Sequence, residues 1–281
     1  MFVRYASVPA NTFSGEYGDM MELQCQQQAL TELRNCAELK HQSILIVGPE
    51  GVGKSYLAKQ FANFLGVNDF HFVKSSTNDL RDAIDESGRL DMPIVVCIEN
   101  LDSGVFAASS VILKFLEEPV PNVYVVVTAR NLHGIPDTIV SRSRLVQVNN
   151  PTMVDLKQFE SIKREYPSDV DMSDFWMCVR SFSDVELIIS LTADQIHHIR
   201  STYSNILKSK CVSDGVWSLQ KYPDRSDTPI EFVLRYIMRH NTNISREVVD
   251  CLSQLSKSRV AAYIVLTLFI FRIHSKEGLL K

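Results

Sequence analysis

The sequence lacks the patterns that mark several common classes of protein. Its six cysteines are scattered and include no C-x-x-C pair, which argues against a zinc module and is typical of reduced, buried thiols in a cytosolic protein. The longest apolar run, Val260–Phe271, is too short to span a bilayer and predicts a buried helix. Phe2–Ala10 contains Arg4 and Pro9 and is too short for a signal peptide. The sequence therefore predicts a cytoplasmic protein that does not contact a membrane.

The chain also lacks a large excess of either positive or negative charge. A net charge of −4 over 281 residues gives no general attraction to nucleic acid, so any DNA contact would need a local patch. The sequence contains no helix-turn-helix, zinc finger, arginine-rich arm, internal repeat or flexible linker. Its 45% hydrophobic content is ample for a packed core, and its length allows one large domain or two to three smaller ones.

The clearest positive signal is an apolar strand that enters a loop of the form G-x-x-x-x-G-K-S and continues into a helix. Glycines in such a loop let backbone N–H groups point at phosphate oxygens. Lys54 is expected to reach the β- and γ-phosphates, and the Ser55 hydroxyl to bind Mg²⁺. The alternative is a glycine-rich turn with a chance lysine, but strand, loop and helix (Tyr56–Leu65) all agree with a P-loop. The predicted nucleotide-binding residues are Gly48, Pro49, Glu50, Gly51, Val52, Gly53, Lys54, Ser55 and Tyr56.

Strand and helix patterns alternate as far as residue 150, which predicts an α/β domain with a parallel sheet. Beyond Pro151 only helical patterns remain. The predicted strands are Ser43–Val47, Phe70–Val73, Ile94–Ile98, Val123–Thr128 and Leu145–Val148. The predicted later helices are Met153–Tyr166, Ser173–Leu191, Ala193–Lys208, Thr228–His240, Ile244–Leu255 and Lys257–His274. We therefore expect a nucleotide-binding domain over residues 1–150, followed by helical units over 151–205 and 206–281.

A second nucleotide motif ends the strand Ile94–Ile98, where Glu99 and Asn100 follow four or more apolar residues. Glu99 is predicted to hold Mg²⁺, usually through water, as in a Walker B motif. Asn100 occupies the place of the catalytic glutamate of most such ATPases. An amide can position water, but it cannot accept a proton as a carboxylate does. The alternative is that Glu99 merely ends a core strand.

Three further stretches resemble the AAA+ ATPase subunits of DNA sliding-clamp loaders. Val111–Pro119 resembles the LLKFLEEP stretch of bacterial delta-prime and gamma subunits, and Val123–Ala129 is similar to their sensor-1 strand. Ile135–Ser143 closely resembles IPxTIxSRC, with a serine in place of the cysteine. The compact chain without a zinc module also resembles the small ATPase subunits of phage clamp loaders. The resemblance covers residues 20–150 motif by motif and the helical remainder more loosely.

The resemblance implies an AAA+ P-loop domain, a helical lid over 151–205 and a helical collar over 206–281. It also implies ATP and Mg²⁺ as ligands, in the cytoplasm of a bacterium or a phage-infected cell. The implied partners are other clamp-loader subunits in a pentamer, the sliding clamp and the backbone of primer–template DNA. Thr77–Ile84 matches the helix that faces the clamp, and the apolar Val260–Phe271 suggests packing between collars.

Individual roles also follow from the resemblance. Glu99 and Asn100 are the expected catalytic pair of this chain's own site. Arg142 is expected to act as an arginine finger in a neighbouring subunit's ATP site; the alternative is an ordinary surface ion pair. Thr128 is the expected sensor-1 residue, with Arg130 or Asn131 as alternative positions. At the sensor-2 position, where the family carries an arginine, this sequence has Asp184, with Arg180 nearby.

Ser109, Ser110 and Lys114 are the candidate contacts to the DNA backbone, and a solvated helix face is the alternative.

The leading functional hypothesis is an ATP-binding clamp-loader subunit. A second hypothesis is a catalytically weak stator that lends Arg142 to a neighbour. The third is an AAA+ remodeller or helicase loader outside clamp loading.

Overall fold

The structure is a computed structural model that divides into two compact units. The first comprises Met1–Ile162 with Ser181–Ser183, and the second Lys163–Arg180 with Asp184–Lys281. The residues described are 23–74, 93–103, 106–162, 171–208, 230–240, 249–251 and 269. The predicted clamp-facing helix and the apolar segment Val260–Phe271, apart from residue 269, lie outside them. Most of the expected collar does too.

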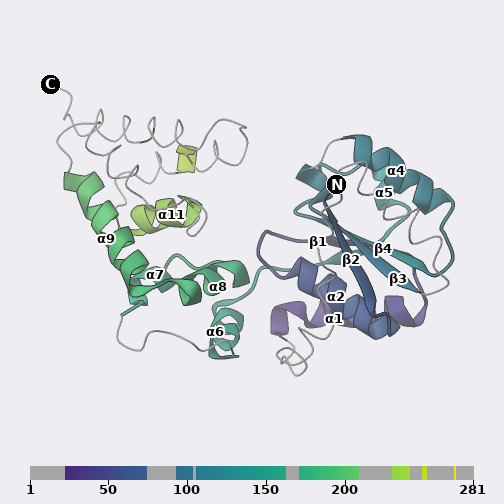
Figure 1. The fold of residues 1–281 in the computed structure, drawn as a ribbon, viewed down its shortest axis with the longest axis horizontal. Helices are drawn as coiled ribbons and strands as arrows, with labels where there is room; N and C mark the ends of the chain where they lie inside the picture. Colours follow the sequence, from purple (N-terminus) through teal and green to yellow (C-terminus); the bar gives the residue numbers. More distant parts are fainter. Residues whose placement is uncertain are drawn as a thin grey trace, which may run out of the picture. The chain divides into compact units, whose positions relative to one another are not determined.

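The first unit is a five-stranded parallel sheet flanked by helices (Figure 1). Its strands are β1 (Ser43–Val47), β2 (Asp69–Lys74), β3 (Ile94–Glu99), β4 (Val123–Ala129) and β5 (Arg144–Gln147). Its helices are α1 (Gln24–Glu38), α2 (Lys54–Leu65), α4 (Phe106–Glu117), α5 (Asp137–Val140) and α6 (Met153–Ile162), with a 3₁₀ turn, η2 (Leu101–Ser103). The predicted α/β class and all five predicted strands are confirmed, with bounds that differ by at most one residue at either end.

The core lies on both faces of this sheet. Side chains alternate along β1, so Ile44 and Ile46 pack with α1 and α2, whereas Leu45 and Val47 pack in a second cluster with α4 and α5. Figure 1 shows α1 and α2 on one side of the strands and α4 and α5 on the other. Runs of valine and isoleucine suit strands that are buried on both faces, as in other parallel sheets.

The strand order β2-β3-β4-β1-β5 places β1 between β4 and β5. All the pairings are parallel, so the carboxyl ends of β1, β3 and β4 meet at one edge of the sheet. The loops that follow these three strands carry most of the predicted site residues. In open parallel sheets this edge is where ligands bind.

The second unit is helical in its described part and contains α7 (Ser173–Trp176), most of α8 (Phe182–Ser190), α9 (Ala193–Lys208) and α11 (Ile230–His240). The prediction of one continuous helix over Ser173–Leu191 is wrong, because a bend separates α7 from α8. The amide of Phe182 donates to the Gly51 carbonyl and not to the carbonyl four residues before it. Apolar periodicity continues across this bend, so the sequence pattern alone did not reveal it.

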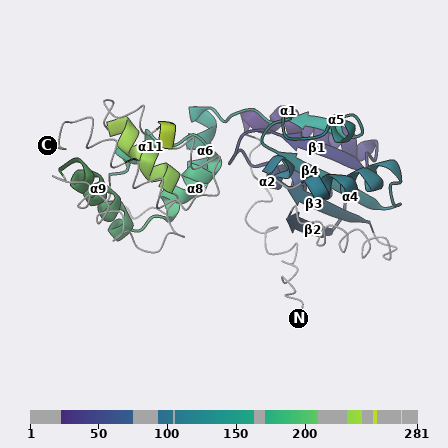
Figure 2. The ribbon, with the colours of Figure 1, turned by 90° about the horizontal axis from the view of Figure 1, so that it is seen from above.

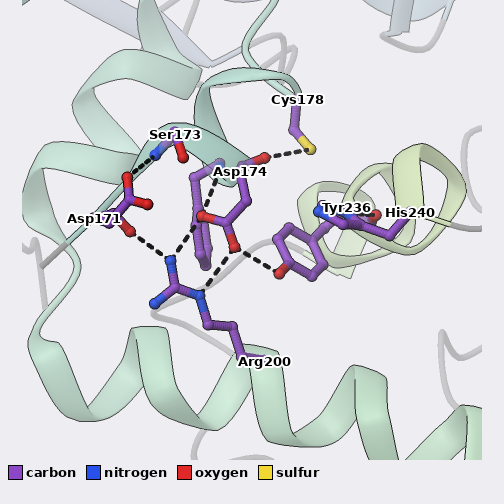
Figure 3. Close-up of polar contacts among 8 residues, drawn as sticks. Asp171, Ser173, Asp174, Cys178, Arg200, Tyr236 and His240 are labelled. Atoms are coloured by element: carbon purple, nitrogen blue, oxygen red, sulfur yellow. Dashed lines mark hydrogen bonds and ion pairs between the residues drawn. The ribbon is translucent and has the colours of Figure 1, made fainter.

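A polar network centred on Asp174 joins α7, α9 and α11 (Figure 3). Arg200 donates to Asp174 through Nε at 2.9 Å and Nη2 at 2.7 Å, and the Tyr236 hydroxyl donates at 2.8 Å. Burial alone would raise the pKa of the Asp174 carboxyl, but the hydrogen bonds from Arg200 and Tyr236 outweigh burial and lower it. Asp174 is therefore held as a carboxylate that ties three helices together.

In the part of the chain that the structure describes, no helix has both the length and the apolar character needed to cross a membrane.

Candidate functional site

The predicted P-loop connects β1 to α2 at the carboxyl edge of the sheet. Gly51 and Gly53 have φ values of +74° and +86°, a left-handed conformation that glycine adopts without a Cβ clash. Gly53 immediately precedes α2, so the N-terminus of this helix faces the loop. Backbone amides and a helix N-terminus that meet in one loop form a site for anions.

Lys54 lies within the loop and is only 7% exposed. Its ammonium donates to the carbonyl of Gly48 at 2.7 Å and to that of Pro49 at 2.6 Å. Burial lowers the pKa of Lys54, and the charges of Asp102 and Glu50 partly oppose this effect. A bound polyphosphate would give the buried ammonium an anionic partner, which these carbonyls do not supply.

Ser55 and Glu99 bring two oxygen ligands together beneath the loop. The Ser55 hydroxyl donates to Oε1 of Glu99 at 2.6 Å. One oxygen comes from the first turn of α2 and the other from the end of β3. A hydroxyl and a carboxylate are the hard oxygen donors that Mg²⁺ prefers, so the two residues fit the metal that the sequence predicts.

Asn100, which follows Glu99 in the sequence, is hydrogen-bonded to Thr128 at the end of β4. The Asn100 backbone has φ +51°, and its N–H donates to the Thr128 hydroxyl at 3.1 Å. Thr128 is 2% exposed, so its hydroxyl is committed to the protein interior. Asparagine tolerates the left-handed conformation better than most residues, which gives Asn100 a backbone role at the position of the family's glutamate.

The alternative sensor-1 positions lie at the rim of the site. The Arg130 guanidinium is 3.4 Å from the carboxylate of Glu50 in the P-loop. The backbone N–H of Arg130 donates to the carboxylate of Asp102 at 3.0 Å. Asn131 accepts the N–H of His133 at 3.0 Å and closes a local turn. Arg130 is therefore the alternative that the structure brings closest to the P-loop.

Arg142 lies at the opposite edge of the sheet. The Ser143 and Ser43 hydroxyls are 2.9 Å apart, which fixes this motif to the beginning of β1, whereas the P-loop follows its end. Five residues of strand span about 17 Å. Arg142 faces a hollow of about 360 Å³ that is also lined by Phe115 and Arg144. It therefore cannot serve the P-loop of its own chain.

The other predicted site residues are placed as follows. Lys114 is exposed in the last turn of α4, and the side chains of Ser109 and Ser110 lie outside what the structure describes. At the sensor-2 position, Asp184 accepts two hydrogen bonds from Arg235, at 2.6 Å and 2.7 Å. This acid is thus committed to an ion pair within the helical unit.

Sequence reasoning missed one residue of the site, Gln26 in α1. Its amide donates to the carbonyl of Val52 in the P-loop at 2.9 Å, and the side chain is 3% exposed. Gln26 stands in a run of glutamines, most of which face solvent, so composition does not distinguish it. Only its place on the apolar face of the helical pattern, beside Leu30 and Leu33, sets it apart.

Residues 72–152 match the model of a protein family described as "DNA polymerase III, delta subunit". Over this segment the chain is similar to that family. The segment contains Glu99, Thr128 and Arg142, and the resemblance to clamp-loader subunits that these motifs suggested is confirmed. The matched segment begins after the P-loop, so it carries no information about Lys54.

Similar solved structures extend the comparison to the whole fold. A DNA polymerase III gamma subunit-related protein of Thermotoga maritima is 17% identical, with 88% of this chain and 99% of that chain covered and a TM-score of 0.58. A point mutant of the RuvB Holliday junction branch migration motor of Thermotoga maritima is 13% identical, with 88% of each chain covered and a TM-score of 0.50. These likenesses show an AAA+-like fold. No curated protein sequence matches the chain.

Proposed function

We propose that the chain is an ATP- and Mg²⁺-binding subunit of a sliding-clamp loader. The observation that carries the proposal is the arrangement at the carboxyl edge of the sheet, where Lys54 is buried in the loop and Ser55 meets Glu99 at 2.6 Å. The family segment supports membership of a clamp-loading complex. In this proposal the P-loop residues Gly48–Tyr56 would hold the phosphates, and Ser55 and Glu99 would hold Mg²⁺, which would neutralise phosphate charge.

The proposal extends to the assembly. The chain joins other clamp-loader subunits in a ring-like pentamer through a collar over 206–281, and it carries a lid over 151–205. The pentamer opens a sliding clamp and places it on primer–template DNA, which it grips through the phosphate backbone. Ser109, Ser110 and Lys114 are the proposed DNA contacts, and Arg142 is the residue lent to a neighbour's ATP site.

A second candidate function is supported by two departures from the family pattern. Asn100 stands where a proton-accepting carboxylate is expected, and Asp184 is committed to Arg235 where a sensor-2 arginine is expected. Both departures weaken hydrolysis at this chain's own site and leave binding intact. The chain would then be a stator that binds nucleotide, hydrolyses it slowly and supplies Arg142.

Replacing Lys54 with alanine tests nucleotide binding at the P-loop. A hydrogen bond to a charged group contributes about 1.5–3 kcal/mol, so affinity for Mg²⁺–ATP should fall about tenfold to 150-fold. The measurement is titration of the purified full chain with a fluorescent ATP analogue. Lys157→Ala is the matched control, because Lys157 is an exposed lysine of the same unit that pairs with Glu160. Equal affinity of the Lys54 variant and the wild type would overturn the proposed site.

A further inference from the structure

Two carbonyls of the P-loop accept hydrogen bonds from outside the loop. The Gly51 carbonyl accepts the N–H groups of Phe182 at 3.0 Å and Ser183 at 3.4 Å, in the first turn of α8. The Val52 carbonyl accepts the side-chain amide of Gln26 at 2.9 Å. Both contacts lie within the first unit. Two different elements therefore hold two consecutive peptide groups of the loop.

Holding a carbonyl also orients the N–H of the following residue. In a planar trans peptide the C=O and the N–H point in opposite directions. The contact at Gly51 therefore directs the Val52 N–H away from α8, and the contact at Val52 directs the Gly53 N–H away from α1. Amides turned outward from a P-loop in this way can donate to an anion held by the loop.

Gln26 is itself firmly placed. It lies in the first turn of α1, which packs beside α2 (Figures 1 and 2). The Cys25 N–H next to it donates to the buried carboxylate of Asp155 at 3.3 Å. A Cβ on Gly53 would lie 2.6 Å from the Gln26 amide nitrogen. Gln26 therefore fits closely against the loop, in the space that a glycine leaves.

We propose that Gln26 is a positioning residue for polyphosphate binding: it fixes the Val52–Gly53 peptide so that the Gly53 N–H faces the phosphates. The inference rests on the proposed function, because it assigns a role toward nucleotide bound at the P-loop. Gln26 does not touch the nucleotide. It acts through the Val52 carbonyl, as the first turn of α8 acts through that of Gly51.

The test is Gln26→Met in the full chain, which keeps the length and volume of the side chain and removes the donor. Affinity should fall about twofold to tenfold, the effect of one neutral hydrogen bond, and equally for Mg²⁺–ATP and inorganic tripolyphosphate. Gln28→Met is the matched control, since the exposed Gln28 side chain donates to Glu32 in the same helix. A loss for ATP without a loss for tripolyphosphate would show contact with the nucleoside and would overturn the proposal.

A second readout distinguishes positioning from a general structural effect. In protein labelled with ¹⁵N-glycine and ¹⁵N-valine, Mg²⁺–ATP should shift the amide resonances of Gly53 and Val52. In Gln26→Met the Gly53 shift should shrink while the Val52 shift, supported by α8, is retained. Equal shrinkage of both, or unchanged shifts with unchanged affinity, would overturn the proposal.

Lys54→Ala separates this inference from the proposed function. If wild type binds ATP, Lys54→Ala loses binding and Gln26→Met matches wild type, the role of Gln26 is wrong and the nucleotide site stands. If wild type binds neither ATP nor tripolyphosphate, both are wrong.

Discussion

Replacing Arg142 with alanine should lower ATP turnover by the assembly that contains this chain by about 10³- to 10⁵-fold, the effect of removing an arginine finger that a neighbour supplies. Such an arginine stabilises the charge that develops on the γ-phosphate. The position of Arg142 supports this role, because it lies at the amino edge of the sheet and the P-loop at the carboxyl edge. A nucleotide that meets Arg142 on that side would therefore belong to a second subunit.

The present contacts of Arg142 do not oppose the role. Its guanidinium donates to the Thr138 carbonyl at 3.1 Å and lies 3.3 Å from Glu117. The Arg142 and Glu117 side chains are 40% and 57% exposed, and exposed ion pairs contribute only about 0–1 kcal/mol. A γ-phosphate that carries more charge than one carboxylate can therefore displace Glu117.

Arg144→Ala is the matched control for this prediction. Arg144 lines the same hollow and is exposed on the edge strand β5, yet we assign it no contact with a neighbour's nucleotide. Turnover by that variant should stay within about threefold of wild type. Equal losses for both variants would indicate a general interface effect, and no loss for Arg142→Ala would refute the finger.

Replacing Asp174 with alanine should destabilise the helical unit by about 2–4 kcal/mol. The change removes two charged hydrogen bonds from Arg200 and leaves the hydroxyl of Tyr236, which is 3% exposed, without its acceptor. Charged hydrogen bonds contribute about 1.5–3 kcal/mol, and an unpaired buried group costs about 1–3 kcal/mol. Urea unfolding followed by circular dichroism measures the difference. Asp194→Ala, at an exposed acid in α9, should change stability by less than about 1 kcal/mol.

The Asp174 contribution should also depend on pH in one direction. The pKa of Asp174 is lowered in the folded state, so its stabilisation is full above the unfolded value of about 3.9 and is lost as pH falls through the folded pKa. The difference between wild type and Asp174→Ala should therefore be constant near neutral pH and shrink below about pH 4. A difference that grows on acidification would contradict the network described around Asp174.

The sequence was sufficient to predict the sheet because its strands carry unmistakable local patterns. β3 and β4 consist mostly of β-branched residues, and such runs are typical of strands buried on both faces of a parallel sheet. The P-loop was predictable for a similar reason, since its glycines, lysine and serine occupy fixed positions in one short segment. Local spacing was enough for both features.

Features set by distant contacts were not predictable in the same way. The beginning of α8 depends on where the Phe182 amide finds its acceptor, which is 131 residues away at Gly51. Gln26 reaches Val52 across a helix and a strand. In the sequence, Asp184 stands where the family carries a sensor-2 arginine. Its ion pair with Arg235 is seen only in the structure. Each depends on tertiary proximity, and no periodicity in the sequence encodes it.

We propose that this chain binds ATP as part of a machine that loads sliding clamps. The most direct measurement is ATP turnover by the assembly purified through a tag on this chain, with and without sliding clamp and primed DNA. We predict that clamp and primed DNA together raise turnover several-fold, more than either does alone. Turnover indifferent to the clamp would contradict the claim and favour an AAA+ remodeller of another kind.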